Sequence, residues 1–250
     1  MNNPIKELID LAHSYQKALP PLPALPPLPS GKELARTIDH TLLKPDATKD
    51  QILQLCQEAL DHQFASVCVN PTNISLAAET LKGSEVLVGS VLGFPLGAYP
   101  PMSKVAEAAT NIALGSQELD MVINIGALKS GDYETVYREC CGVVQAAHSY
   151  GVLVKVIIEC GLLTTFEKIL ACLLVKEAQA DFVKTSTGMI AGGATLEDVD
   201  LMVRVVEGKI GVKAAGGIRT YNDAVSMLKA GATRIGSSSG VKIIQEAALS

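Results

Sequence analysis

One pattern recurs along this 250-residue chain from Glu33 onward, and it restricts the fold more than any other feature. A short apolar strand is followed by a turn rich in glycine or hydroxyl residues, and then by an amphipathic helix. We expect strands at Arg36–Leu42, Ala65–Asn70, Val86–Gly93, Leu119–Asn124, Leu153–Glu159, Asp181–Thr187, Gly211–Ala215 and Arg234–Gly236. Eight strands that alternate with helices predict an α/β fold, a (β/α)8 TIM barrel.

Threonines mark the starts of several of the expected helices. Thr48 with Gln51, and Thr164 with Glu167, have the spacing of capping boxes, and Thr220 is a further N-cap. The competing architecture is an open, doubly wound sheet. Because the Gly-x-Gly-x-x-Gly turn of that fold is absent after the first strand, we prefer the barrel.

An extra segment precedes the repeats. Ile5 to Leu19 has apolar residues at helical spacing, and the prolines of Pro20 to Pro29 exclude both a helix and a central strand. We expect this second stretch to be a polyproline II spacer; the alternative is a ligand for an SH3-like groove. The chain is therefore divided into an N-terminal helix with a proline-rich leader, residues 1–32, and a barrel domain, residues 33–250.

Composition limits the core and the partners. Hydrophobic residues make up 48% of the chain, aromatic residues 4%, and Trp is absent, so we expect a core of Val, Ile, Leu and Ala. A net charge of −5 offers no basic surface for nucleic acid. The six cysteines have neither C-x-x-C spacing nor a His pattern of a metal site, which predicts buried, reduced thiols and no metal. We also expect no cofactor.

Neither a secretion signal nor a membrane helix is expected. The sequence does not begin with a cationic stretch followed by an apolar one. The charge-free window from Val86 to Ser103 is interrupted by three glycines and three prolines. We therefore expect a cytoplasmic protein whose partners are small molecules, with neither nucleic acid nor membrane among them, and we keep a homodimer open as its assembly.

The stretch from Asp181 to Gly188 carries the residue that we single out as a nucleophile. Lys184 lies on a strand with a buried pattern, just before a turn of hydroxyl residues and glycine. Because desolvation disfavours the ammonium form, a buried lysine is either paired or neutral. A neutral amine can attack a carbonyl group and form an imine. The alternative is an ordinary lysine at a strand end, whose ammonium reaches water.

Two further residues join this lysine because the carboxyl ends of barrel strands meet on one face. Lys213 is on the next strand, and a second ammonium close to Lys184 lowers the pKa of that lysine. A lysine with the ordinary pKa near 10.4 is only about one part in two thousand neutral at pH 7. Asp120 is placed either to relay protons or only to neutralise the two lysines.

Two turns rich in glycine and serine follow the last two strands, at Ala214–Arg219 and Ile235–Ser239. In many barrels the backbone N–H groups of such turns bind phosphate. Each turn alone is a weak signal, but both together, after strands seven and eight, favour a phosphate site.

Five motifs of the chain resemble those of one known family. They are Ile38-Asp39-His40-Thr41-Leu42, Gly93-Phe94-Pro95-Leu96-Gly97, Asp120-Met121-Val122-Ile123-Asn124, Lys184-Thr185-Ser186-Thr187-Gly188 and Lys213-Ala214-Ala215-Gly216-Gly217-Ile218-Arg219. In this order, across about Glu33 to Gly240, they are similar to the motifs of deoxyribose-phosphate aldolases. The resemblance implies a class I aldolase on a TIM barrel, without metal. Such an enzyme reversibly cleaves 2-deoxy-D-ribose 5-phosphate to D-glyceraldehyde 3-phosphate and acetaldehyde.

The resemblance also implies roles for single residues. Lys184 would form the Schiff base, while Asp120 and Lys213 would handle protons. The predicted substrate-binding residues are Asp39, Cys68, Thr185, Gly188, Gly216, Gly217, Ser238 and Ser239. The partners would then be a sugar phosphate and an aldehyde. Two other interpretations stay open: another Schiff-base aldolase or transaldolase-like enzyme acting on a sugar phosphate, and a phosphate-binding barrel without catalysis.

Overall fold

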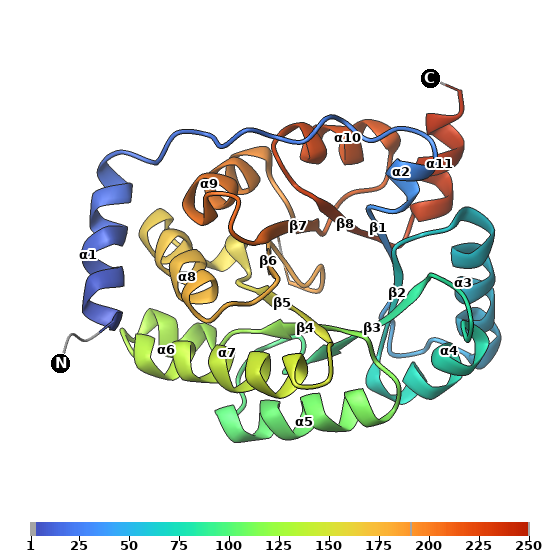
Figure 1. Ribbon diagram of the computed structural model, residues 1–250, viewed down its shortest axis with the longest axis horizontal. Helices are drawn as coiled ribbons and strands as arrows, with labels where there is room; N and C mark the ends of the chain where they lie inside the picture. Colours follow the sequence, from blue (N-terminus) through green and yellow to red (C-terminus); the bar gives the residue numbers. More distant parts are fainter. Residues whose placement is uncertain (1–3, 191, 250) are drawn as a thin grey trace.

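The computed structural model describes residues 4–190 and 192–249. Eight parallel strands close into one barrel, in which neighbours follow chain order and β8 pairs with β1 (Figure 1). The strands are β1 (Ile38–Leu42), β2 (Ser66–Val69), β3 (Leu87–Leu92), β4 (Glu118–Val122), β5 (Leu153–Ile157), β6 (Phe182–Lys184), β7 (Gly211–Ala215) and β8 (Arg234–Ser237). This arrangement confirms the predicted TIM barrel.

Helices between the strands surround the barrel (Figure 1). They are α3 (Lys49–His62), α4 (Ile74–Thr80), α5 (Pro101–Ala113), α6 (Ile125–Lys129), α7 (Tyr133–His148), α8 (Thr165–Glu177), α9 (Leu196–Val206) and α10 (Tyr221–Lys229), with α11 (Gly240–Ala247) after β8. Thr48 and Thr164 form the predicted capping boxes with Gln51 and Glu167, and Thr220 caps α10. Within the described ranges, none of the helices is long and apolar enough to cross a membrane.

Most strands lie where the sequence predicted them but are shorter. The strand predicted over Leu153–Glu159 ends at Ile157, because Glu159 has a left-handed backbone conformation with φ 55°, which a strand cannot contain. The strand predicted over Asp181–Thr187 is reduced to the three residues of β6. Beyond it, the hydroxyl of Thr185 replaces the backbone as the hydrogen-bond partner of Ala215. The ends of the predicted strands are thus loops at the carboxyl face.

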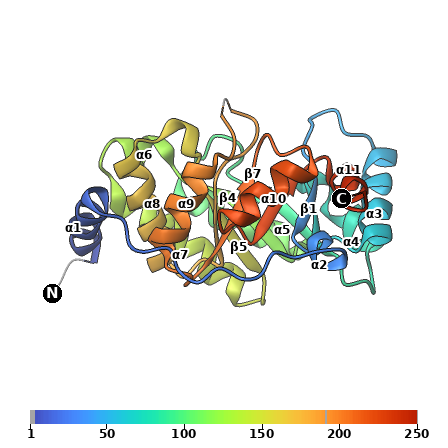
Figure 2. The same ribbon diagram turned by 90° about the horizontal axis from the view of Figure 1, so that it is seen from above.

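Helix α1 (Pro4–Lys17) lies against α8 on the outside of the barrel, as both views show (Figures 1 and 2). Ile5, Leu8 and Ala12 are buried and belong to the same apolar cluster as the barrel core. The ring of His13 stacks on Phe166 of α8, with 4.5 Å between the ring centroids. The amphipathic pattern predicted near the N-terminus therefore forms a helix whose apolar side is covered by the barrel.

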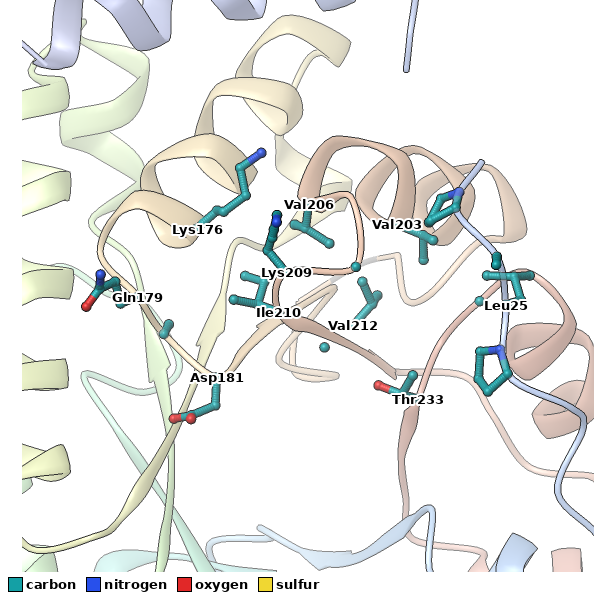
Figure 3. Close-up of a pocket in the computed structure, with 17 residues that line it drawn as sticks. Leu25, Lys176, Gln179, Asp181, Val203, Val206, Lys209, Ile210, Val212 and Thr233 are labelled. Carbon is teal, nitrogen blue, oxygen red and sulfur yellow. The ribbon is translucent and has the colours of Figure 1, made fainter. Parts of the chain in front are cut away.

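The proline-rich leader connects α1 to α2 (Lys32–Ala35) and crosses the N-terminal ends of several strands (Figures 1 and 2). Residues 19–30 have no regular secondary structure. Arg204 of α9 donates a hydrogen bond to the carbonyl oxygen of Pro20 at 3.2 Å. Between the leader and the barrel lies a cavity of about 640 Å³, walled by Leu25 on one side and by Val203 and Val212 on the other (Figure 3). The leader therefore rests on the barrel at the face opposite the carboxyl ends.

We expect Ala12→Glu to release α1 from α8. Ala12 is fully buried, and burying a carboxylate without a partner costs at least about 2 kcal/mol, so the helix should detach instead. Limited proteolysis should then cut at α1, while the circular dichroism of the barrel persists. Ser14→Glu places the same charge on the exposed side of the helix and is the matched control. An α1 that stays protected in Ala12→Glu would contradict this packing.

Candidate active site

Asp120, Lys184 and Lys213 lie together inside the barrel. The parallel register places Lys184 of β6 beside Lys213 of β7. Asp120 reaches both from β4: its Oδ2 accepts hydrogen bonds from Lys184 Nζ at 2.7 Å and from Lys213 Nζ at 2.6 Å. All three side chains are buried. One carboxylate oxygen therefore joins the two lysines that the sequence placed on adjacent strands.

Further charged side chains extend this arrangement into one buried charge network. Lys155 of β5 donates to Glu118 at 2.6 Å and to Asp120 Oδ1 at 3.1 Å. Arg234 of β8 donates to Asp39 and to Glu118, at 2.5 Å in each case. The charge network consists of Asp39, Glu118, Asp120, Lys155, Lys184, Lys213 and Arg234.

The balance of charge in this network indicates which lysine gives up its proton. Three carboxylates face four cationic groups, so the charges balance only when one cation is neutral. Lys155 contacts three carboxylates, whereas Lys213 and Arg234 contact two each. Of the three carboxylates of the network, Lys184 contacts Asp120 alone. Because its neutralisation breaks the fewest ion pairs, the geometry favours Lys184 as the free amine.

The pKa values of the two lysines differ in direction. Burial lowers the pKa of Lys184, and the Lys213 ammonium lowers it further, although Asp120 acts in the opposite direction. Burial alone would also lower the pKa of Lys213, but Asp120 and Asp39 outweigh burial and hold that pKa above its ordinary value. Lys213 therefore stays an ammonium ion. Its effect on Lys184 has the predicted sign, but burial has the larger effect.

A cavity of about 240 Å³ lies at the carboxyl ends of the strands and reaches Lys184. Its walls are the ends of β1, β7 and β8 and the loops after β1, β6, β7 and β8, at residues 41–44, 187–189, 215–219 and 236–238. Lys184 is the one member of the charge network that lines it. A small molecule in this cavity would thus meet the amine that is easiest to neutralise, while the other charges stay beneath it.

Four of the eight predicted substrate-binding residues line this cavity, and four do not. Those that line it are Gly188, Gly216, Gly217 and Ser238. Asp39 instead lies inside the charge network, and the hydroxyl of Thr185 is bound to Ala215. Cys68 is buried, which raises its pKa to about 11 and keeps the thiol neutral at pH 7. Ser239 is not among the lining residues either, so a direct contact of these four with substrate stays a prediction.

The sequence analysis gave no role to several residues that the structure brings to the site. Glu118 and Arg234 are the first residues of β4 and β8, whereas the sequence predicts site residues toward the carboxyl ends of strands. Lys155 stands alone in the apolar strand Leu-Val-Lys-Val-Ile, and that isolated charge was a usable signal. Thr41, near the end of β1, and Lys44, just after it, also line the cavity, and the sequence analysis gave neither a role.

The larger cavity beneath the leader is a poor candidate for the site. Its charged lining residues, Lys176, Asp181 and Lys209, come from the N-terminal side of β6 and β7 and include no member of the charge network (Figure 3). We therefore place the candidate active site in the smaller cavity. Across residues 4–190 and 192–249, no group of three or more His, Cys, Asp or Glu side chains could hold a metal ion.

Comparison with known proteins identifies the family. Residues 34–246 match the family described as DeoC/LacD family aldolase. The chain belongs to this aldolase family. The deoxyribose-phosphate aldolase of Thermococcus gammatolerans is 58% identical over 219 residues, which cover 87% of this chain and 97% of that protein. That of Streptococcus gordonii is 57% identical over 213 residues, which cover 85% of this chain and 96% of that protein.

Solved structures of similar aldolases share the whole architecture. A putative deoxyribose-phosphate aldolase from Coccidioides immitis superposes with a TM-score of 0.91 at 41% identity, over 98% of each chain. The deoxyribose phosphate aldolase from Aeropyrum pernix superposes with a TM-score of 0.81 at 35% identity, over 96% of each chain. Coverage of that extent includes part of the segment that precedes the family match.

We expect Lys213→Met to shift the pH dependence of the aldolase toward alkaline pH. The substitution removes an ammonium that lowers the pKa of Lys184 and leaves Asp120, which raises it, free to act on Lys184. The neutral fraction of Lys184 at pH 7 then falls about tenfold for each unit by which its pKa rises. Borohydride trapping of the imine, measured from pH 6 to 10, should be weak at pH 7 and recover at higher pH.

Lys213→Arg is the matched control, because it keeps a cation at this position. Its trapping profile should stay closer to that of the wild type. If the Met variant traps the imine with an unshifted profile, Lys213 does not act on the pKa of Lys184.

Proposed function

We propose that this chain is a class I aldolase that reversibly cleaves 2-deoxy-D-ribose 5-phosphate to D-glyceraldehyde 3-phosphate and acetaldehyde. The observation that carries the proposal is the position of Lys184, the one cation of the charge network that lines the cavity, with a pKa below its ordinary value because of burial. The family and the names of its similar members support the substrate. We treat the Schiff base as the central intermediate.

Each chemical step can be given to a group of the site. Lys184 Nζ attacks the C1 aldehyde, and loss of water from the carbinolamine leaves an imine. The C3 hydroxyl then loses its proton, the C2–C3 bond breaks, and the electron pair forms an enamine on C1 and C2 while glyceraldehyde 3-phosphate leaves. Protonation of C2 and hydrolysis release acetaldehyde and free Lys184. Asp120, bonded to both lysines at 2.6 and 2.7 Å, is placed to pass these protons with Lys213.

The phosphate is assigned to the loop after β7. Gly216 and Gly217 have φ values of 90° and 84°, which glycine adopts without strain and which turn the backbone of this loop toward the cavity. Backbone N–H groups of such turns bind phosphate oxygens. Arg219 and Lys44 also line the cavity and add positive charge there. The phosphate end of the substrate would thus lie beside the loop after β7, and its aldehyde end beside Lys184 of β6.

The assembly state and the cellular compartment of the chain are inferred from two further observations. The Aeropyrum pernix enzyme is described as tetrameric, which supports an oligomer of this chain, with the homodimer as our prediction for its form. The six cysteines are free thiols, which supports the predicted cytoplasmic location. Light scattering of the purified chain measures the mass of the assembly and so tests the predicted homodimer.

Lys184→Arg should abolish the reaction and leave the fold intact. Arginine keeps the positive charge but cannot form an imine, so kcat/KM should fall by at least about a hundredfold. The measurement is acetaldehyde release from 2-deoxyribose 5-phosphate in the presence of EDTA, with wild type as the reference. Circular dichroism of the variant serves as the control for folding.

Three outcomes would contradict the proposal. Activity of Lys184→Arg above a hundredth of wild type would exclude Lys184 as the nucleophile. An imine that is trapped only with a ketose phosphate would favour another Schiff-base aldolase. The lack of any trapped imine, with phosphate binding retained, would favour a binding barrel without catalysis.

Ser238→Asp should weaken the binding of the phosphorylated substrate selectively. Ser238 lines the cavity beside the proposed phosphate site, and two like charges about 4 Å apart repel by at least about 1 kcal/mol. KM for 2-deoxyribose 5-phosphate should rise roughly tenfold or more, whereas KM for unphosphorylated 2-deoxyribose should change little. Ser238→Asn has nearly the same size without the charge and is the control. Equal changes for both substrates would place the phosphate elsewhere.

A further inference from the structure

A second buried ion pair lies outside the charge network, beside strand β4. Lys104 of α5 and Glu139 of α7 are fully buried, and Lys104 Nζ lies 2.7 Å from Glu139 Oε2. The proposed reaction gives neither residue a role, and neither lines the substrate cavity. Two helices thus each contribute a charge where apolar side chains usually fill the space between helix and strand.

Both side chains of this pair also bind the backbone at the end of β4. Lys104 Nζ donates to the carbonyl oxygen of Val122 at 2.7 Å, and Glu139 Oε1 accepts from the N–H of Asn124 at 2.5 Å. On the side of β5, the N–H of Ile123 donates to the carbonyl oxygen of Ile157 at 3.1 Å. Hydrogen bonds from both sides of the strand therefore fix residues 122–124, which begin two positions after Asp120.

The motif Gly93-Phe94-Pro95-Leu96-Gly97, for which the proposed reaction has no use, covers the same backbone. A Cβ atom on Gly97 would come within 1.8 Å of the Ile123 carbonyl oxygen, and one on Gly93 would come within 3.1 Å of Lys104 Cε. The loop is closed by a hydrogen bond of 2.7 Å from Gly97 N–H to Gly93 O. Glycine at both positions lets the loop close over Lys104 and the end of β4.

Stability alone does not account for a charged pair at this place. Burying two charges has a large desolvation cost, and apolar residues of similar volume are often as stable or more so. Apolar side chains, however, cannot bind the Val122 carbonyl or the Asn124 N–H. What the pair adds is a fixed backbone position just after Asp120.

The geometry points to Lys104 and Glu139 as positioning residues for Asp120, an inference that rests on the proposed aldolase function. Asp120 must contact Lys184 at 2.7 Å and Lys213 at 2.6 Å, and a displacement of about 1 Å is enough to disturb such contacts. Imine formation depends on the amine of Lys184, which comes from β6. A looser end of β4 therefore impairs proton transfer at Asp120 more than it impairs the formation of the imine.

The test replaces both charges together, so that neither is left buried without a partner. In Lys104→Met/Glu139→Leu we expect the circular dichroism of the wild type and only a modest fall in melting temperature, because the Val122 carbonyl and the Asn124 N–H lose these partners. The kcat for 2-deoxyribose 5-phosphate should fall at least about tenfold, with KM within about twofold of wild type. Borohydride trapping of acetaldehyde on Lys184 should persist, which separates a positioning role from a general loss of structure.

Two further variants complete the design. Lys104→Met/Glu139→Gln keeps an amide oxygen for the Asn124 N–H and should recover part of the lost kcat. Lys168 and Asp198 form a less buried ion pair, 2.5 Å apart between α8 and α9, and in the described part of the chain neither side chain binds a strand. Lys168→Met/Asp198→Leu should therefore keep the wild-type kcat.

Several results would overturn the inference. One is a wild-type kcat in either folded Lys104/Glu139 variant; if the Leu variant does not fold, the Gln variant decides. Another is a parallel loss of melting temperature, kcat and trapping, which would leave the pair a structural role only. A third is an equal loss of kcat in the Lys168/Asp198 control. Failure of the wild type itself to release acetaldehyde would instead contradict the proposed function.

Discussion

The Asp120 carboxylate is the contact on which the arrangement of the site depends. One of its oxygens binds Lys184 and Lys213, and the other binds Lys155. Two ammonium groups about 4 Å apart repel each other by roughly 4 kcal/mol at an effective dielectric constant of about 20. A single carboxylate between them reverses the sign of the interaction. The barrel interior therefore holds three lysines around Asp120, and the pKa of Lys184 is lowered by burial although Asp120 acts against that shift.

The order of the barrel could be predicted from the sequence because each repeat has its own strand, turn and helix. The prediction that Lys184 and Lys213 are neighbours needed only that they are on consecutive strands. The positions of Glu118 and Arg234 could not be predicted in this way. They start their strands, and the stagger of strands around a closed barrel decides which residues share a level. That stagger depends on the closure of the whole sheet and cannot be predicted from the sequence of a single strand.

Within the site, local alternation decides which predicted residues reach the cavity. Thr185 follows Lys184 directly, and successive side chains of a strand point to opposite sides, so its hydroxyl meets Ala215 instead of the cavity. Gly188 and Gly216 were predictable as cavity residues because they are in turns beyond the strands. The sequence analysis singled out Lys184 among the cations, but the number of carboxylates around each cation, which sets them apart in the structure, could not be predicted.

The lowered pKa of Lys184 is unfavourable for folding, and the rest of the charge network offsets that cost. A lysine whose pKa is lower in the folded state reduces stability as the pH falls below its unfolded pKa, near 10.4. Lys155 and Lys213 have raised pKa values, so their contribution is present below about pH 10 and is lost as the pH rises through the folded pKa. Asp39 and Asp120 have lowered pKa values, so their contribution is present above about pH 4 and is lost as the pH falls through the folded pKa. Between these limits the four neighbours are charged and stabilising, and Lys184 is the group for which proton loss is favoured. The pKa of the nucleophile is thus lowered within the same buried network whose ion pairs stabilise the barrel across this pH range.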